Sequence, residues 1–388
     1  MTGKTDYFNL QASLTDEQLL IKESTAAWVN KNIKNKIDKH FTEGTTPYEI
    51  LKELPDIGAF GTIIPEEYGG MGADFISFGL MMQELERGDT SIRVMSSIQT
   101  SLVMYSIYKY GNEEQRLKYL PKLATGEYLG AFGLTEPNFG SNPAAMHSHF
   151  KIKGDQLVIN GSKIWIGNAA KADIAIVWAK NEAGSIQGII VETDSVTNFS
   201  TSVISDKLSF RASHTGELVF SNSVMPKKQI LQNSNSIKDA YNCLNIGRYA
   251  IAWGCIGIAS ECYEIALQYS KERIQFGKPI GSKQLIQKKL AEMITEITKA
   301  QLMSFHLGKL MNEKIASYEQ ISMAKRNNVQ MAQDVVREAR QILGGMGITS
   351  DYPIMRHMMN LETLVTYQGT HEIHLLITGR DITGINAI

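Results

Sequence analysis

Residues 150–159 read Phe150-Lys151-Ile152-Lys153-Gly154-Asp155-Gln156-Leu157-Val158-Ile159. Apolar residues alternate on both sides of Gly154-Asp155, which is the pattern of two β-strands joined by a tight turn. The alternation returns in residues 174–178, ahead of a turn-like segment at 181–184, and strand texture continues through 186–191. The pattern predicts a small β-domain that spans residues 131–235.

The segments before this domain have a helical period. Thr15-Asp16-Glu17-Gln18 forms a capping-box pattern that predicts the start of a helix. A second helix is predicted where apolar residues recur at helical spacing, at Phe75, Phe78, Met82 and Leu85. Its polar face is expected to hold Glu84, Glu86 and Arg87. Between the two helices, Pro65 and Gly69-Gly70 predict a loop. We therefore expect an N-terminal helical domain over residues 1–130.

The last third of the chain is helical again. Amphipathic runs cover about 245–269, 283–307 and 319–343, and they are punctuated by Pro279 and Gly344-Gly345. Helices of this length with apolar stripes pack as a bundle, so a four-helix-bundle domain is expected over residues 236–388. The order helix, sheet, helix predicts a mainly α protein with an inserted β-domain, not a doubly wound α/β fold.

The composition excludes several classes of protein. The 388 residues are 43% hydrophobic and 20% charged, with a formal net charge of −1, so nothing points to nucleic acid or to an anionic membrane surface. The polar N-terminus lacks the apolar core of a signal peptide, and no apolar run looks long enough to cross a bilayer. Cys243, Cys255 and Cys262 show no CxxC spacing, which favours a reducing compartment. We expect a cytoplasmic protein.

Common catalytic motifs are missing from the sequence. No GxGxxG follows a strand, and there is no Walker motif and no GxSxG. His371 and His374 are three residues apart on an expected helix, but no third ligand has suitable spacing, so no metal site is expected.

Five segments carry a resemblance to one family. They are Phe132-Gly133-Leu134-Thr135-Glu136-Pro137-Asn138-Phe139-Gly140-Ser141, Asn160-Gly161-Ser162-Lys163-Ile164-Trp165-Ile166, Arg273-Ile274-Gln275-Phe276-Gly277-Lys278-Pro279-Ile280, Gln341-Ile342-Leu343-Gly344-Gly345-Met346-Gly347 and Tyr367-Gln368-Gly369-Thr370. In this order, they resemble the acyl-CoA dehydrogenase family over nearly the whole chain. Runs at 284–297 and 360–385 resemble the glutaryl-CoA dehydrogenases in particular. The resemblance implies that family's fold, with a helical domain, a middle β-barrel-like domain and a helical bundle.

The resemblance also implies FAD as the cofactor and a set of residues that bind it. Thr135, Trp165 and Gly167 would lie by the flavin ring, and Thr370 and Glu372 would also line the site. Ser141 would lie near the CoA pyrophosphate, and Arg248 would also belong to the site for the substrate and CoA. The adenine half would be bound by residues of a neighbouring subunit in a homotetramer, namely Arg273, Phe276, Gln341 and Gly345.

Charged residues suggest the class of substrate. Glu86, Arg93 and Ser97 match the positions by which glutaryl-CoA dehydrogenases hold the distal carboxylate of the acyl chain. A guanidinium suits a planar carboxylate because its donors are forked and permanently charged. We expect Arg93 to supply two parallel hydrogen bonds, with Ser97 adding a third and Glu86 orienting the guanidinium.

Two departures from the family pattern concern the reaction. The family base is a glutamate, but here the position is Gln368, and an amide has no useful basicity near neutral pH. Relatives with a relocated base carry it just before the arginine at 248, where this chain has Gly247. The second departure is Gly167, which stands where a hydroxyl residue usually faces the flavin. Asn142, in place of a common aspartate, is a third and milder change. Classical dehydrogenation is therefore expected to be slow or lost.

Three functions remain open from the sequence. The first is an enzyme acting on a short acyl thioester with a distal anion, by decarboxylation, desulfination or slow dehydrogenation. The second is a flavin monooxygenase acting on a CoA-bound or carrier-protein-bound acyl group. The third is a flavin-binding protein without catalysis. A dehydrogenase would also need an electron-transfer flavoprotein as partner.

Overall fold

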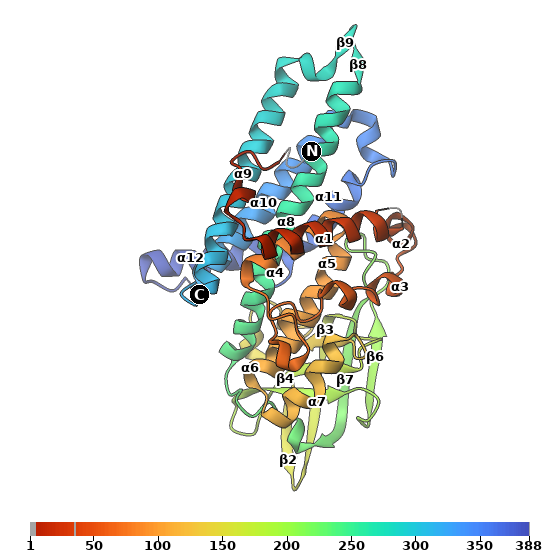
Figure 1. Ribbon diagram of the computed structural model, residues 1–388. Helices are drawn as coiled ribbons and strands as arrows, with labels where there is room; N and C mark the ends of the chain where they lie inside the picture. The colour runs from red at the N-terminus through yellow and green to blue at the C-terminus, as the bar shows by residue number, and fades with distance from the viewer. Residues whose placement is uncertain (1–4, 35, 388) are drawn as a thin grey trace.

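The computed structural model describes residues 5–34 and 36–387. Residues 1–4 and 35 of the expected N-terminal domain, and residue 388 of the expected C-terminal domain, lie outside the described residues. An N-terminal group of helices and a C-terminal helical bundle flank a β-sheet in the order predicted from the sequence (Figure 1). The prediction of a mainly α protein with an inserted β-domain is confirmed.

The N-terminal part contains seven α-helices and one π-helical segment. Thr15 and Gln18 form the predicted capping box at the start of α1. The bounds are α1 (Asp16–Asn32), α2 (Ile37–Glu43), α3 (Tyr48–Leu51), α4 (Phe75–Gly88), α5 (Thr90–Ser97), the π-helix η4 (Ile98–Met104), α6 (Tyr105–Tyr110) and α7 (Glu113–Ala124).

The middle part is one seven-stranded sheet. Its strands are β1 (Gly130–Gly133), β2 (His149–Lys153), β3 (Gln156–Gly167), β4 (Ile174–Lys180), β5 (Ile186–Glu192), β6 (Phe199–Val203) and β7 (Thr215–Pro226). The order is β1-β4-β2-β3-β7-β6, with β5 paired to β4. The predicted hairpin is β2 and β3, in which Phe150 pairs with Ile159 across Gly154-Asp155. The C-terminal end of the long strand β3 carries two of the predicted site residues, Trp165 and Gly167.

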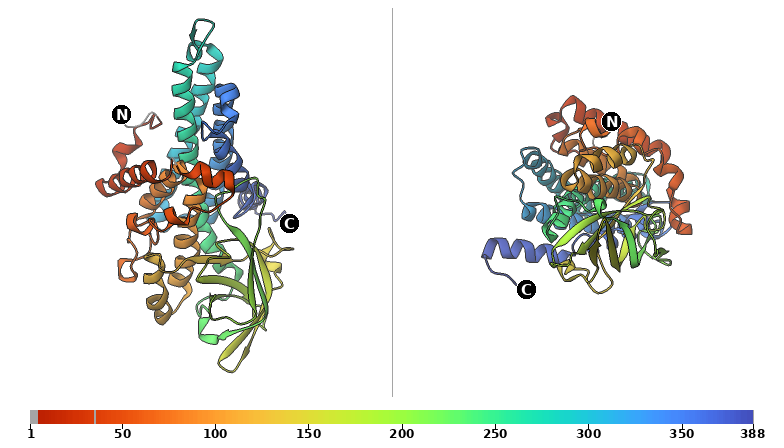
Figure 2. Two further views of the ribbon diagram at one scale, coloured as in Figure 1. Left: turned by 90° about the vertical axis from the view of Figure 1, so that its right-hand side faces the viewer. Right: turned by 90° about the horizontal axis from the view of Figure 1, so that it is seen from below.

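The C-terminal part is built on three long helices, α8 (Ile237–Glu272), α9 (Gln284–Asn312) and α10 (Tyr318–Leu343). The short hairpin of β8 (Ile274–Gln275) and β9 (Lys278–Pro279) joins α8 to α9 at the tip of the bundle (Figure 1). Two shorter helices follow, α11 (Ile354–Thr366) and α12 (His371–Thr383). Figure 2 shows α12 extending away from the other helices.

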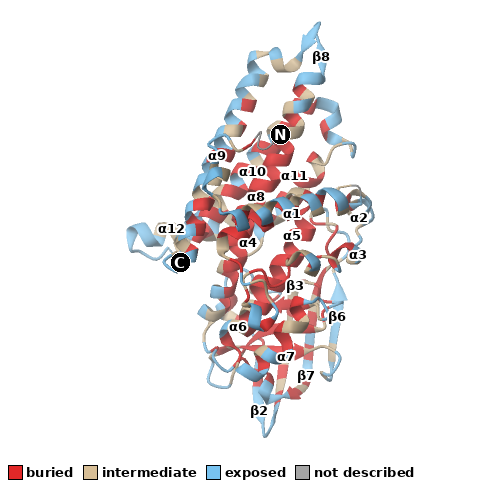
Figure 3. Ribbon diagram, in the orientation of Figure 1, coloured by how far each residue is buried: buried red, intermediate tan, exposed pale blue. Residues whose placement is uncertain are grey.

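Helix α8 is the central element of the molecule. It packs against both α10 and α4, and Figure 3 shows its middle turns buried. The expectation that no apolar run is long enough to cross a bilayer was wrong, because α8 has the necessary length and composition. However, 83% of its most apolar stretch is buried inside the protein, so the core explains its apolar character.

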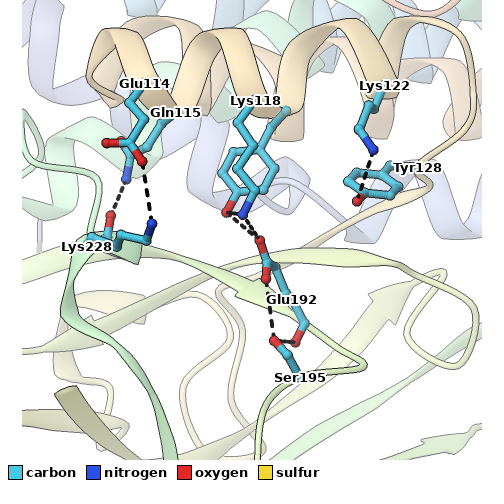
Figure 4. A network of polar contacts seen from close by, with 9 residues as sticks. Glu114, Gln115, Lys118, Lys122, Tyr128, Glu192, Ser195 and Lys228 are labelled. Carbon is cyan, nitrogen blue, oxygen red and sulfur yellow. Dashed lines mark hydrogen bonds and ion pairs between the residues drawn. The ribbon is translucent and has the colours of Figure 1, made fainter. Parts of the chain in front are cut away.

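Hydrogen bonds and an ion pair connect helix α7 of the N-terminal part to the middle β-domain (Figure 4). The hydroxyl of Tyr119 donates to the Glu192 carboxylate of β5 over 2.7 Å, and Lys118 pairs with the same carboxylate. The Gln115 amide donates to the carbonyl of Lys228, over 2.9 Å. These contacts fix the sheet against the helices on the side away from the bundle tip.

The predicted polar face of the second helix is wrong for two of its three residues. Glu84 and Glu86 of α4 are buried, whereas Arg87 remains partly exposed. Helix α4 ends at Gly88, and Asp89 caps a new helix, α5, by accepting from the Ser91 amide at 2.7 Å. The cause is that α4 packs against both α8 and α1, so more than one of its faces is covered.

A glycine on α8 permits this burial. A Cβ on Gly254 would overlap the Oε2 atom of Glu86 and lie 3.3 Å from the Nε atom of Arg93. The backbone of α8 thus approaches the buried Glu86–Arg93 pair as closely as only glycine allows.

We predict that Gly254→Ala lowers the free energy of unfolding by about 1–3 kcal/mol, the usual cost of overpacking a core. Gly379→Ala on α12 is the matched control, because nothing in the described chain lies within 4 Å of the added methyl group. The control should be neutral or stabilising by up to about 1 kcal/mol through helix propensity. Chemical denaturation of both variants measures the difference; equal stabilities would contradict the close approach.

Candidate active site

Arg93 lies at the centre of the candidate site. Its Nε atom donates to Oε2 of Glu86 over 2.7 Å, and its Nη2 atom donates to Oε1 of Glu86 over 2.9 Å. The same Nη2 atom donates to the hydroxyl of Tyr367 over 2.6 Å. The side chains of Arg93 and Glu86 are 0% exposed. The remaining nitrogen, Nη1, has no hydrogen-bond partner among the described residues.

These contacts keep Arg93 charged and leave one nitrogen for a ligand. Burial lowers the pKa of Arg93, but the Glu86 carboxylate and the Tyr367 hydroxyl more than offset this, so the net pKa is raised. The expectation of two parallel hydrogen bonds from Arg93 to a ligand is corrected, because Glu86 occupies Nε and Nη2. Only the N–H groups of Nη1 are available to an anion.

Ser97 lies four residues after Arg93, at the end of α5. It is buried, and its Oγ atom lies 3.2 Å from Oγ of Ser101 in the π-helical segment. The side chain is therefore on the same helix as Arg93, but its described hydrogen bond goes to Ser101.

Gln368 lies in the turn between α11 and α12. Its backbone has a φ of 52°, in the left-handed region, and its carbonyl accepts from Nε of Arg248 over 2.8 Å. Its side-chain Oε1 atom is buried with no partner in the described part of the chain. A Cβ on Gly247 would overlap this Oε1 atom, so the Gln368 amide occupies the space in front of Gly247. The next residue but one, Thr370, caps α12 by accepting from the Ile373 amide.

The end of β3 and the loop after β1 form the second half of the region. Trp165 has a φ of 63° and is 58% exposed, so its ring lies on the surface. The amide of Ile164 donates to the carbonyl of Thr135 over 2.9 Å. A Cβ on Gly167 would come within 2.5 Å of Cδ1 of Ile98, so Ile98 fills the position of the missing side chain.

A buried ion pair holds the loop that carries Thr135. Lys163 of β3 donates to Oε1 of Glu136 over 2.8 Å and to the carbonyl of Leu134 over 3.1 Å. Glu136 also accepts from the amides of His147 and Ser148. Ser141, further along the same loop, is exposed. The half-buried Thr135 is thereby fixed between two anchored neighbours.

The remaining predicted residues lie elsewhere. Arg273 and Phe276 are at the bundle tip, where Phe276 is 92% exposed, and Gln341 and Gly345 are exposed near the end of α10. Arg273 directly follows the last residue of α8, 25 residues after Arg248, which at about 1.5 Å per residue is about 37 Å. Glu372 is exposed on the first turn of α12. The hairpin that carries Arg273 and Phe276 lies at the opposite end of the molecule from the β-sheet, so in one chain these two residues are remote from it (Figure 1).

The two histidines of α12 differ in environment. His374 is buried and its pKa is lowered to about 2, by burial first and then by the charges of Lys325 and Arg248. His371 is half-buried. Within residues 5–34 and 36–387 no three His, Cys, Asp or Glu side chains gather as a metal site. The three cysteines are buried free thiols.

Sequence reasoning missed three residues of this region. Tyr367 was read only as part of a motif, yet its hydroxyl contacts Arg93. Lys325 and Gly254 were not singled out. The sequence could have indicated Lys325, because this lysine lies at helical spacing from residues that are buried on α10. These residues are Ile321, Ala324, Asn328 and Val329. A charged residue within an apolar helix face is a candidate for a buried polar role.

Comparisons with known proteins agree with this architecture. The three domain models of acyl-CoA dehydrogenases match the chain: the N-terminal domain at residues 15–127, the middle domain at 131–223 and the C-terminal domain at 237–383. A glutaryl-CoA dehydrogenase from Desulfococcus multivorans is 34% identical over 382 residues, covering 96% of this chain and 98% of the relative.

Two solved structures are also similar to this chain over nearly its whole length. A glutaryl-CoA dehydrogenase from Mycobacterium smegmatis in complex with FADH2 superposes with a TM-score of 0.96 at 40% identity, covering 99% of both chains. A glutaryl-coenzyme A dehydrogenase in complex with glutaryl-CoA has a TM-score of 0.92 at 34% identity, covering 96% of both chains. The chain therefore belongs to the acyl-CoA dehydrogenase family of FAD-dependent enzymes.

Proposed function

We propose that this protein binds FAD and acts on a short acyl-CoA thioester whose acyl chain ends in a carboxylate or a similar anion. The observation that carries the proposal is the unpaired Nη1 atom of Arg93, on a buried guanidinium held by Glu86 and Tyr367. A buried cation with a free donor is costly unless a ligand completes its hydrogen bonds. An acyl chain with a distal anion would supply that partner.

The residues fit a flavin in two halves. Trp165 offers an exposed aromatic surface close to the half-buried Thr135. At Gly167, Ile98 packs against the backbone, so this position presents no hydroxyl group to a flavin. Arg273 and Gln341 offer a cation and an amide at exposed positions, which suit the pyrophosphate and adenine half. The residues proposed for the flavin ring and those proposed for the adenine half lie far apart in one chain. We therefore infer that a second copy of the chain supplies the residues for the adenine half, as in the expected homotetramer. When bound, FAD supplies the redox chemistry of the family.

The reaction lacks a base at the family position. The Gln368 amide cannot accept a proton near neutral pH, and Gly247 has no side chain at all. The titratable groups behind the turn do not replace a carboxylate there, because Lys325 is bound to backbone carbonyls and burial lowers the pKa of His374 to about 2. We infer that the substrate is dehydrogenated only slowly, or that it loses CO2 or a sulfinate group without oxidation. The second route requires a leaving group already β to the thioester carbonyl, which takes up the electron pair as an enolate before a solvent proton adds to carbon, or a good leaving group such as a sulfinate.

Arg93→Met should weaken the binding of glutaryl-CoA by about 2–5 kcal/mol, the usual cost of removing one partner of a buried charge pair. Binding of butyryl-CoA should change little. Titrations of the FAD-loaded protein, followed by flavin absorbance, compare the two ligands. The double variant Glu86→Gln/Arg93→Met is the control, because it does not leave the Glu86 carboxylate buried without its partner. Equal losses for both ligands in the double variant would show that Arg93 is only structural.

Gln368→Glu should accelerate flavin reduction by glutaryl-CoA about 10²-fold or more, the usual contribution of a general base. Wild type should be slow, and Gln368→Leu, which adds no base, should remain slow. Anaerobic stopped-flow absorbance measures all three proteins. A wild-type rate near about 10 s⁻¹, typical of enzymes, would mean that another group removes the proton.

Arg273→Ala should reduce FAD affinity about tenfold or more, as expected for losing a charge-assisted hydrogen bond. Lys278→Ala, which removes an exposed cation from the same hairpin, should have no such effect. The ratio of flavin to protein after gel filtration, with the molar mass from light scattering, gives the result. A monomer that retains FAD fully in both variants would refute the contribution of a second copy.

A further inference from the structure

Two buried cations hold three consecutive carbonyl groups in the turn that contains Gln368. Nζ of Lys325 donates to the carbonyl of Tyr367 over 3.1 Å and to the carbonyl of Gly369 over 2.8 Å. Nε of Arg248 donates to the intervening carbonyl of Gln368 over 2.8 Å. Lys325 comes from α10 and is 0% exposed, whereas Arg248 comes from α8. The turn is thus bound to two different helices of the bundle.

This turn needs such support because of its backbone. Gln368 has a φ of 52° and Gly369 a φ of 100°, and only the second is a glycine. The left-handed region is unfavourable for a residue with a Cβ, so Gln368 adopts it only where the surroundings impose it. The donors on Lys325 and Arg248 are the groups that face the carbonyls of this turn.

The turn is also connected to the anion site. The backbone of Tyr367 accepts from Lys325, while its hydroxyl accepts from Nη2 of Arg93 over 2.6 Å. One residue therefore joins Lys325 to the guanidinium whose Nη1 atom is unpaired in the described chain. A shift of the turn would move the Tyr367 ring and change the orientation of the Arg93 guanidinium, which is bonded to the Tyr367 hydroxyl.

We propose that Lys325 is a positioning residue, which fixes the Tyr367–Gly369 turn and, through the Tyr367 hydroxyl, aims Arg93 at the distal anion of the substrate. The inference rests on the proposed function and deepens it, because it adds a residue that determines specificity without contacting the ligand. The donor is a lysine because one ammonium group reaches two carbonyls that point to a common centre.

The charges around Lys325 predict how this effect depends on pH. Arg248 and Cys255 of α8, Arg93 of α5, His371 and His374 of α12 and the neighbouring Arg326 make up its electrostatic surroundings. Burial lowers the pKa of Lys325 to about 7. The pKa values of both histidines are lowered, and burial raises the pKa of Cys255 well above its usual value.

Lys325 is therefore the member of this group whose pKa lies near neutrality, at about 7. The protonated ammonium group, present below its pKa, is the stronger donor to the two carbonyls. As the pH rises through about 7 the proton is lost and the hold on the turn weakens. Preference for the anionic ligand should decline in the same direction.

The test is the ratio of the affinities for glutaryl-CoA and butyryl-CoA, measured by flavin absorbance on the FAD-loaded protein at pH 6.5 and pH 8.5. The ratio cancels the titration of the CoA moiety, which both ligands share. In wild type the preference for glutaryl-CoA should fall about fivefold between the two pH values, the difference expected between a charged and a neutral donor. In Lys325→Met it should be about tenfold lower at pH 6.5 and independent of pH.

Lys288→Met, which removes an exposed lysine from α9, is the matched control and should behave as wild type. If Lys325→Met keeps the wild-type ratio and its pH dependence, or weakens both ligands equally, the positioning role is overturned. Should that variant not fold, Tyr367→Phe cuts the connection at the hydroxyl. It should likewise abolish the pH dependence of the ratio, and a wild-type profile would overturn the proposal.

Failure of the proposed substrate class gives a different result. If wild type binds both ligands equally at both pH values, the distal-anion site is refuted. The effect of Lys325 on the turn is then measured separately, as the rate of flavin reduction by butyryl-CoA in the Gln368→Glu variant. Adding Lys325→Met should slow flavin reduction about tenfold by displacing residue 368. An unchanged rate would overturn the positioning role as well.

Discussion

The guanidinium of Arg93 is a charge enclosed in a helical core, and much of the surrounding structure follows from the need to satisfy it. Isolated burial of such a charge is prohibitively costly, so partners must be supplied in fixed geometry. Glu86 provides them from α4 and Tyr367 from the turn before α12. Gly254 keeps α8 free of side-chain atoms where the pair lies. Three regions that are distant in the sequence, namely α4 with α5, α8 and the turn before α12, are thus brought together around one cation, which retains one unpaired nitrogen within the described chain.

The turn that contacts this cation also carries the most unusual chemistry of the chain. Gln368 stands at the position where the resemblance places the base, its amide oxygen lies in front of Gly247, and neither residue can remove a proton. At the other side of the proposed flavin site, Ile98 occupies the space next to Gly167. The two changes concern the proposed places of proton removal and flavin binding, whereas Nη1 of Arg93, the proposed anion-binding group, remains unpaired among the described residues. A protein that keeps its means of selecting a substrate, but lacks the usual base, suits a reaction in which the bond broken is not the α-C–H bond.

Much of the fold could be predicted from periodicity, and the exceptions have physical reasons. The β2–β3 hairpin and the three long helices followed directly from alternation and helical spacing. The polar face assigned to Glu84 and Glu86 was wrong, because the sequence of α4 does not reveal that a glycine-containing helix will cover it. The role of Tyr367 depends on a contact across 274 residues, which no local pattern contains. Residues at the bundle tip were recognised by resemblance alone, and a single chain leaves them exposed.

The central claim is that a buried, correctly aimed Arg93 selects an anionic acyl chain. The most direct test compares glutaryl-CoA with glutaramyl-CoA, in which a neutral amide of nearly the same size replaces the distal carboxylate. Competition titrations on the FAD-loaded wild-type protein give both dissociation constants. The account predicts that the carboxylate ligand binds about tenfold tighter or more, since a hydrogen bond between charged groups exceeds one to a neutral amide by about 1–2 kcal/mol. Equal affinities, or tighter binding of the amide, would contradict it.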